Sequence, residues 1–404
     1  MSGTIAGGGG LPGGVNSYAP GGGGGGGGDG VFADSGIVLT TAPAAVIRGG
    51  NGGGGGSDVS GYPGCTSGAG GGGGNGVEFA GSGTLANSGG IYGGSGGAYG
   101  TGNYGPPGGS GGGHGVVGAG LTITNSGSIG AGAAGSLSKF GIPGTAGTAG
   151  DAILFEGGAN TLKLLTGSTI TGAIELATGA SASIQPQNSG LTLSSNVVLD
   201  ASSSSAGFDT TSAPLTASGV ISGTGSISVA GSGANPLILS ATNTFTGGTT
   251  VNSGILQIDG AIGQVTIGGG VLDGIGAVGN ITASGGSVSP GESDQMFGAL
   301  TSNGTANIAA ASALSIRSTD GVICSALNAA GALTLAGTLS IRFENAPEIG
   351  ATCTIATGSG VNGTFANVQS APATVTVIYN ATNVQFIVTA SDDIFADGFD
   401  GGAH

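Results

Sequence analysis

Two aspartates, Asp259 and Asp273, come nearest to a catalytic pair in this chain. Each is followed by glycine, and they lie 14 positions apart. Glycoside hydrolysis needs two carboxylates about 5–9.5 Å apart. Asp-Gly is, however, a common turn signal, and no Lys, Arg or His lies between Lys163 and Arg317. We therefore expect turn roles for both aspartates and predict no catalytic residues and no enzyme; the alternative is a polysaccharide-active lyase or hydrolase.

Three cysteines could form a covalent link or bind a metal. Cys324 and Cys353 both lie in strand-like segments of the C-terminal region, which makes them the candidate structural disulfide. It would close a loop of 29 positions and add about 3 kcal/mol in the chain-entropy model. The alternative is two buried free thiols that fill gaps in the core. Cys65 lies in a loop without an obvious partner, and the cysteine spacing fits no metal site.

The remaining candidate groups give weak signals. His114 lies in a glycine loop and His404 is terminal, so neither supports a catalytic triad. The segment Gly24–Val31, with Asp29, matches the sequence pattern of a calcium-binding nonapeptide. Any polyglycine run before an Asp matches this pattern, so the match is weak evidence for calcium binding. No Gly-Lys-Ser/Thr follows the glycine runs, as a phosphate-binding loop requires. We therefore predict no cofactor and no metal.

Composition restricts the partners. Five basic residues stand against 20 acidic ones, giving a net charge of -15, and only 6% of residues are charged. Nucleic acid and anionic membrane are poor partners, since both require clustered Lys and Arg. No run approaches the roughly 20 apolar residues of a membrane-spanning helix. The composition suits an exported protein, although the N-terminus lacks a signal peptide; if the protein is exported, we expect a misassigned start or a fragment.

Short strands with glycine turns must position any functional residue. Between Asn243 and Gly260, the strand-like segments 249–251 and 255–258 are separated by Asn-Ser-Gly and ended by Asp-Gly. The pattern recurs loosely at 265–267, 271–272 and 280–282. Strands of three to five residues, each followed by a turn, build a solenoid in which successive coils stack strand on strand. Apolar residues at i and i+2 continue upstream from 162 to 239, so we expect almost no helix.

The segment from Asn243 to Ile258, N-T-F-T-G-G-T-T-V-N-S-G-I-L-Q-I, resembles the passenger-associated strand repeat of bacterial autotransporters. The resemblance extends more weakly to Gly291, and the order of segments from Gly331 to Asn367 is similar to the C-terminal end of such passengers. It implies a right-handed parallel β-helix and an extracellular or outer-surface location. It implies no catalytic residues. We expect a structural or adhesive role, with a host surface, glycan or other cell-surface material as partner; the sequence does not indicate an oligomeric state.

Four domains are predicted along the chain. Residues 1–150 hold 60 of the 98 glycines. A short apolar pattern recurs in them at Val31, Val77 and Val116, and again just beyond them at Ile153. We interpret them as β-helix coils with long, flexible glycine-rich loops, where recognition usually sits. Residues 151–298 are regular coils. Residues 299–390 form a C-terminal β cap with longer strands at 339–343, 374–379 and 384–388, because a solenoid needs a cover for its last coil. Residues 391–404 are an acidic tail.

Overall fold

The computed structural model describes residues 3–15, 21–57, 67–101, 109–136, 146–291 and 297–391. Within these ranges every regular element is a β-strand, and no helix is long and apolar enough to cross a membrane. Cys65, His404 and all but the first residue of the predicted tail lie outside the described ranges.

The chain divides into two compact units. The N-terminal unit comprises Met1–Asp209 with Ser218–Ser226, and the C-terminal unit comprises Thr210–Ala217 with Ile227–His404. The compact units therefore divide between residues 209 and 227, whereas the predicted domain boundaries mark changes of composition at 150 and 298. Those boundaries stay predictions.

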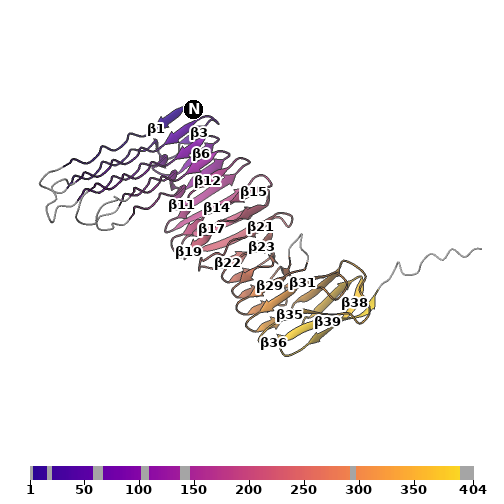
Figure 1. Cartoon of the computed structure of the whole chain (residues 1–404). Coiled ribbons are helices and arrows are strands. Elements are labelled where there is room, and N and C mark those ends of the chain that lie inside the picture. The colour runs from indigo at the N-terminus through magenta and orange to yellow at the C-terminus, as the bar shows by residue number, and fades with distance from the viewer. Residues whose placement is uncertain are drawn as a thin grey trace, which may run out of the picture. The chain divides into compact units, whose positions relative to one another are not determined.

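In the N-terminal unit, each strand pairs in parallel with its counterpart one coil later (Figure 1). The first sheet contains β1 (Thr4–Ala6), β4 (Val46–Arg48), β7 (Gly90–Tyr92), β10 (Ser128–Gly130) and β12 (Thr169–Thr171). The second contains β2 (Val31–Ala33), β5 (Val77–Phe79), β8 (Val116–Ala119), the start of β11 (Ile153–Leu164), β13 (Ile174–Leu176), β16 (Val197–Leu199) and β19 (Ile221–Gly223). The third contains β3 (Val38–Thr41), β6 (Gly83–Asn87), β9 (Leu121–Asn125), the end of β11, β14 (Ala180–Pro186) and β17 (Ser205–Thr210). This arrangement is a parallel β-helix, as predicted.

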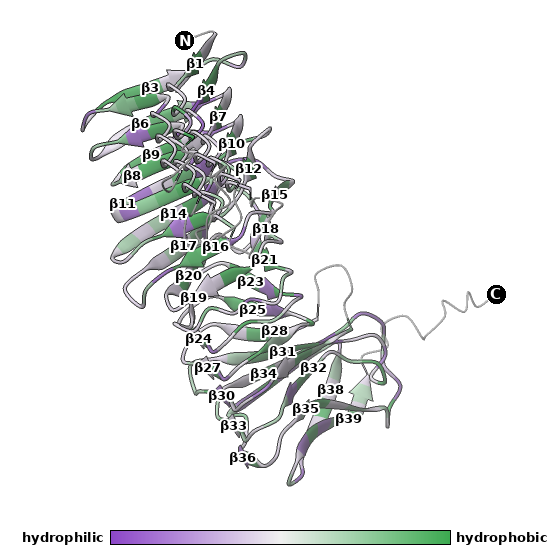
Figure 2. Cartoon of the chain, turned by 60° about the vertical axis from the view of Figure 1, so that its left-hand side comes forward, coloured by the Kyte–Doolittle hydropathy of each residue, from purple (hydrophilic) through white to green (hydrophobic). Residues whose placement is uncertain are grey.

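Aliphatic side chains stack along the inside of the N-terminal unit. In the second sheet, the register aligns residues that are at most 1% exposed: Val77, Val116, Ile153, Ile174 and Val197. Buried and partly exposed residues alternate along β14, because successive side chains of a strand point to opposite faces; Figure 2 shows this mixture of hydropathies within strands. Full burial of one Val or Ile side chain contributes about 1.5–3 kcal/mol, so a few residues per coil suffice for a core.

A ladder of buried polar side chains runs beside this aliphatic core. The Thr41 hydroxyl donates to Asn87 Oδ1 at 2.6 Å, and the Asn87 amide donates to Asn125 Oδ1 at 2.8 Å. The Asn125 amide donates in turn to the Ser168 hydroxyl at 2.7 Å. Thr41, Asn87 and Asn125 are buried, and buried amides need such partners. The ladder therefore joins four successive coils, at the ends of β3, β6 and β9 and, through Ser168, in the turn between β11 and β12.

The C-terminal unit also stacks strands in parallel. Its longest sheet contains β18 (Leu215–Ala217), β21 (Pro236–Leu239), β23 (Ile255–Ile258), β25 (Val271–Gly274), β28 (Ser287–Pro290), β31 (Ala313–Ser318), β34 (Thr338–Phe343) and β37 (Asn367–Ala371). A second stack contains β20 (Ser226–Gly231), β22 (Thr249–Val251), β24 (Val265–Ile267), β27 (Ile281–Ala283), β30 (Ala306–Ile308), β33 (Leu333–Leu335) and β36 (Val361–Gly363). A third contains β26 (Ala277–Val278), β29 (Ala299–Ser302), β32 (Ala326–Ala329) and β35 (Thr352–Thr357).

The parallel pattern changes at β35. This strand pairs in parallel with β32 but antiparallel with β39 (Asn383–Ser391), which pairs antiparallel with β38 (Ala373–Tyr379). The predicted cap strands 374–379 and 384–388 thus form an antiparallel hairpin on the edge of the third stack. The other predicted cap strand, 339–343, lies within β34, which pairs in parallel with β31 and β37. It therefore belongs to the parallel stack.

Candidate functional site

Four coils of the N-terminal unit open between the first and the second sheet into glycine-rich stretches, here named excursions 1 to 4. They comprise residues 7–30, 49–76, 93–115 and 131–152. Each has an outgoing segment that leaves the first sheet and a return segment that enters the second. In Figure 1 the described segments run side by side away from the strands. The fifth coil has no excursion, because only Gly172 and Ala173 join β12 to β13.

Backbone hydrogen bonds join neighbouring excursions at every third residue. Nine such bonds, 2.7–2.9 Å long, link excursion 1 to excursion 2 and to the end of β4: Gly7 N–H to Arg48 O, Gly10 to Asn51, Gly13 to Gly54, Gly24 to Ala69, Gly27 to Gly72, Gly30 to Asn75, Gly50 to Gly28, Gly53 to Gly25 and Gly56 to Gly22. The return segment also donates to its own outgoing segment, as from Gly25 to Leu11 at 2.7 Å. A period of three is that of an extended helix of the polyproline II type, which makes no internal hydrogen bonds. The predicted loops are thus extended segments that are held together by backbone hydrogen bonds. Together they are named the glycine array.

The interior of the glycine array admits a side chain at only one position in three. A Cβ atom on Gly52 would lie 1.8 Å from the carbonyl oxygen of Gly71, and one on Gly53 would lie 2.0 Å from that of Leu11. Backbones this close require glycine. On Gly54 the nearest atom would be 3.8 Å away. In excursions 2 to 4, the corresponding outward positions of the outgoing segments hold small, uncharged residues: Asn51, Gly54, Ser57, Ser95, Ala98, Thr101, Ala133 and Ser136.

The return segments carry a polar ladder where they approach the second sheet. Asp29 Oδ1 accepts a hydrogen bond from Asn75 N–H at 2.7 Å, and Asn75 Oδ1 accepts one from His114 N–H at 2.9 Å. His114 Nδ1 accepts one from Asp151 N–H at 2.9 Å and lies 3.1 Å from Asp151 Oδ2. Asp29, the acidic residue of the segment that matches the calcium-binding nonapeptide pattern, thus helps to link two excursions. His114 does the same.

A partly buried carboxyl group lies on the second sheet near this ladder. Glu175 of β13 pairs with Leu154 of β11 and Val198 of β16. Burial, followed by the negative charges of Asp151 and Asp200, raises the pKa of Glu175, whereas His114 lowers it. The cause is that removal from water and nearby like charges both disfavour the ionised form.

The two aspartates considered for catalysis lie on neighbouring coils of the C-terminal unit. Gln257 of β23 pairs with Asp273 of β25, and its amide donates to both carboxylate oxygens of Asp259 at 3.0 and 3.2 Å. Asp273 Oδ1 accepts a hydrogen bond from Gly274 N–H at 2.8 Å. Gln257 therefore lies next to both aspartates, one through strand register and one through hydrogen bonds.

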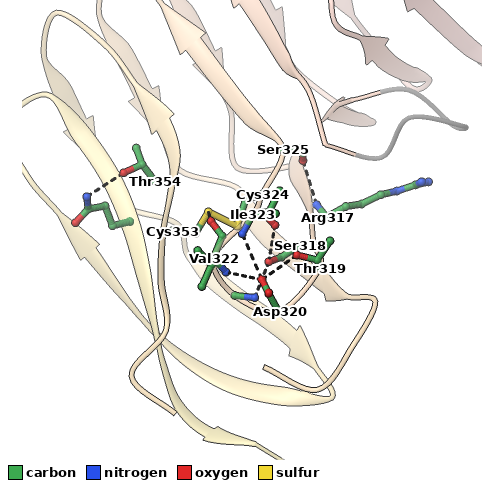
Figure 3. The surroundings of a disulfide bond; sticks show 12 residues. Arg317, Ser318, Thr319, Asp320, Val322, Ile323, Cys324, Ser325, Cys353 and Thr354 are labelled. Atoms are coloured by element: carbon green, nitrogen blue, oxygen red, sulfur yellow. Dashed lines mark hydrogen bonds between the residues drawn. A yellow bond between two sulfur atoms is a disulfide. The ribbon is translucent and has the colours of Figure 1, made fainter. Parts of the chain in front are cut away.

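Cys324 and Cys353 are joined by a disulfide, with Cα atoms 6.4 Å apart (Figure 3). Cys353 lies in β35, and Cys324 follows a tight loop after β31. In that loop Asp320 Oδ1 accepts hydrogen bonds from Val322 N–H at 3.0 Å and from the Thr319 hydroxyl at 2.8 Å. Together with a bond from Ile323 N–H, these lower the pKa of Asp320. The disulfide ties this loop to the strand that carries the antiparallel hairpin.

A cavity of about 230 Å³ lies beside β12, at the end of the first sheet. Its walls come from β12, from the end of β11 and from β15 (Leu191–Leu193) with the residues after it. The lining contains only aliphatic and hydroxyl side chains, and the Ser195 hydroxyl donates to Ile170 O at 2.7 Å across it. The cavity lacks the charged or aromatic groups that usually fix a ligand.

The register of the glycine array was not predicted from the sequence. Its signal is a Gly-Gly-x period that repeats from one excursion to the next. In excursion 2 the x positions of the outgoing segment are Asn51 and Gly54, and those of the return segment are Ala69, Gly72 and Asn75. Alignment of the tracts by position from the flanking strands, rather than by composition, would have shown it.

The comparison with known protein families gives one match. The passenger-associated-transport-repeat family matches residues 232–258, a range that contains β21, β22 and β23 of the C-terminal unit. The resemblance predicted from Asn243 to Ile258 is confirmed, and over these residues the chain is similar to the passenger-associated repeat. No curated protein matches the chain.

Proposed function

We propose that this chain is a non-enzymatic passenger-type β-helix with a structural or adhesive role, located outside the cell or on the outer cell surface. The glycine array is its contact element, and the partner is a glycan, a host surface or other cell-surface material. The location rests on the passenger-associated-transport-repeat at 232–258. The role rests on the array.

The observation that supports this role is that a coil closes without an excursion. The fifth coil joins β12 to β13 with only Gly172 and Ala173, and its strands pair normally with those of the coil before it. Excursions of more than 20 residues are therefore not needed to form a coil. Ordering so many glycines is entropically costly, which indicates that the array serves something other than the core.

The outward positions of the outgoing segments suit a broad, weakly polar contact. Hydroxyl and amide side chains there, such as Asn51, Ser95 and Thr101, can donate and accept hydrogen bonds and carry no charge. Some of them already bond from one excursion to the next: Asn51 Oδ1 accepts from Ser95 N–H at 2.9 Å, and the Thr101 hydroxyl donates to Ser57 at 2.7 Å. A surface held in this way loses little conformational freedom on binding.

The test is to remove the array and keep the coils. Each excursion is replaced by Gly-Ala, as in the fifth coil, and binding to immobilised polysaccharides and to intact cells is compared with that of the unaltered protein. We expect β-sheet circular dichroism to persist and binding to disappear. A matched variant that loses only excursion 4 should keep part of the binding. Unchanged binding after removal of all four excursions would exclude the array as the contact element.

The alternative function is a polysaccharide-active enzyme that uses Asp259 and Asp273. The position of Gln257 next to both residues supports it. Depolymerisation of a polysaccharide by the purified protein, abolished by Asp259→Asn and by Asp273→Asn, would favour this alternative over the adhesive role. Intact polysaccharide after prolonged incubation would count against it.

A further inference from the structure

We propose that the C-terminal unit carries a binding site for the carboxylate groups of an acidic polysaccharide, centred on Arg317 and Arg342. These two residues, here named the arginine pair, lie on the neighbouring strands β31 and β34 and are directly opposite each other in the strand register. The site narrows the glycan partner of the proposed function to an acidic one, and it rests on that function only in taking the partner to be a glycan.

The position of the arginine pair is unusual for this chain. Only five of its 404 residues are basic, and the net charge is -15. Two of the five nevertheless occupy opposite positions on strands that lie about 4.8 Å apart. Like charges at such a distance repel one another. The pair therefore does not stabilise the strand stack, which indicates another use for its positive charge.

Both side chains of the arginine pair lie on the outer face of their sheet. The adjoining Ile316 and Phe343 are buried, and successive side chains of a strand point to opposite faces. The Arg342 side chain is 77% exposed. Arg317 is partly exposed, and Figure 3 shows its side chain extending away from the disulfide. A ligand in solution can therefore reach both guanidinium groups.

The carboxylates of the described residues neutralise the arginine pair only weakly. Glu344 Oε1 lies 4.0 Å from Arg342 Nε, whereas a charge-assisted hydrogen bond is about 2.7–2.9 Å long. Within the part of the chain that the structure describes, this is the only ion pair that either arginine makes. The planar N–H fork of a guanidinium matches a carboxylate, and this capacity is largely unused here.

A hollow of about 310 Å³ lies beside the arginine pair, lined by residues of β34 and β37. The next position in the row of the two arginines is Ala371, whose short side chain leaves space beside Arg342. Ser340 and Gln369 also line the hollow, and hydroxyl and amide groups can bind the hydroxyls of a sugar. A carboxylate placed over Ala371 would meet Arg342, with Arg317 one strand further along the same row.

The lining of the hollow favours a sugar over an acidic peptide. Its one large apolar residue, Ile341, is only 2% exposed, whereas peptide ligands need pockets for their side chains. The affinity should fall steeply with salt, because the arginine pair is exposed and screened by ions and the chain as a whole repels polyanions.

The experiment measures binding of the full chain to a fluorescent oligomer of galacturonic acid, by fluorescence anisotropy at low salt. Arg342→Gln should weaken binding about tenfold or more, because it removes charge-assisted hydrogen bonds, and Arg317→Gln should weaken it less. Lys163→Gln removes the same charge from the N-terminal unit and should bind like the unaltered protein. Ala371→Glu, which places a carboxylate in the hollow and keeps both arginines, should abolish binding.

Three further measurements identify the ligand and separate this site from the glycine array. A methyl-esterified oligomer, which lacks the charge, should not bind. A glutamate oligomer of equal charge should bind more weakly than the galacturonate oligomer. The variant without the four excursions should bind galacturonate like the unaltered protein, so this result stays separate from the test of the array.

Four outcomes would overturn the proposal. One is that the unaltered protein does not bind the galacturonate oligomer at low salt. Another is that the double variant Arg317→Gln, Arg342→Gln binds it like the unaltered protein. The third is equal binding of the methyl-esterified oligomer, and the fourth is equal binding of the glutamate oligomer. Loss of binding on removal of the excursions, with the arginine variants unaffected, would assign the contact to the array instead.

Discussion

The stacked strands and the glycine array of the N-terminal unit both join one coil to the next with backbone hydrogen bonds, but they use side chains in opposite ways. In the strands, many alternate residues are buried aliphatic or aromatic groups such as Leu162 or Phe155. In the interior of the array, two residues of three have no side chain, and the backbones pack directly against one another. The strands gain stability from apolar burial, whereas the array depends on many hydrogen bonds of about 0.5–1.5 kcal/mol each.

This difference indicates that the segments of the array are stable only when they pack together. A single extended glycine segment has no internal hydrogen bonds and pays the largest backbone entropy of any residue type. Each interior segment therefore needs neighbours on several sides, which only equivalent segments of adjacent coils provide. The strand stack holds those coils in register, so we expect the array to depend on the stack but not the reverse.

The largest loss of stability is expected when a buried side chain of the strand stack is removed. Phe155→Ala in β11, where the side chain is fully buried, should lower the free energy of unfolding of the N-terminal unit by about 3–5 kcal/mol. Urea unfolding followed by circular dichroism measures it. The neighbouring exposed Glu156 provides the control, and Glu156→Ala should stay within about 0.5 kcal/mol. Equal effects of the two variants would contradict the buried position of Phe155.

A smaller effect is expected in the polar ladder of the stack. Asn87→Ala leaves Thr41 and Asn125 without a shared partner, and each buried polar group left unpaired costs about 1–3 kcal/mol. We expect a loss of about 2–4 kcal/mol in the same unfolding measurement. Thr84→Ala on the same strand, at a partly exposed position, should change little. A neutral Asn87→Ala would mean that the ladder adds nothing to apolar stacking.

The third prediction concerns the array alone. Gly53→Ala should destabilise it by about 1–3 kcal/mol, because an overpacked position forces the backbones apart. Gly54→Ala, one residue along, should be neutral or stabilising by up to about 1 kcal/mol, because it restricts the unfolded chain without a clash. Amide exchange should speed up in excursions 1 and 2 with Gly53→Ala only, while the strands keep their protection. Identical behaviour of the two variants would exclude a three-residue period.

The smallest effect is the pH dependence of Glu175. Since its folded-state pKa is raised, the unfolded chain releases this proton at lower pH than the folded chain does. The stability of the N-terminal unit should therefore fall as the pH rises from the ordinary glutamate pKa through the raised value. Glu175→Gln should remove that slope and be the more stable variant at neutral pH. Solvent screening keeps the effect small, and urea midpoints from pH 4 to pH 7 measure it.

Much of the strand stack could be predicted from the sequence, because period-2 burial and turn residues are local signals. Thr249–Val251, Ile255–Ile258 and Val265–Ile267 are strands as predicted, and the family match covers two of them. The order of the glycine array could not be predicted, because a run such as Gly52–Gly56 carries no side-chain pattern of its own. Its order depends on contacts with residues about 40 positions away. The parallel pairing of residues 339–343 could not be predicted, because strand length does not reveal the direction of a partner strand.

The every-third-residue bonding also makes the reach of the array adjustable in fixed steps. One Gly-Gly-x triplet added to both segments of an excursion lengthens it by about 9 Å, at about 3.1 Å per residue. Such an insertion keeps the inward or outward direction of every existing residue, because the insertion equals one full period of the bonding pattern. Insertions of one or two residues within a segment would turn the wrong face inward. We therefore expect the lengths of the glycine segments to vary between related genes in steps of three residues. The array would become longer or shorter while the core of the coils stays unchanged.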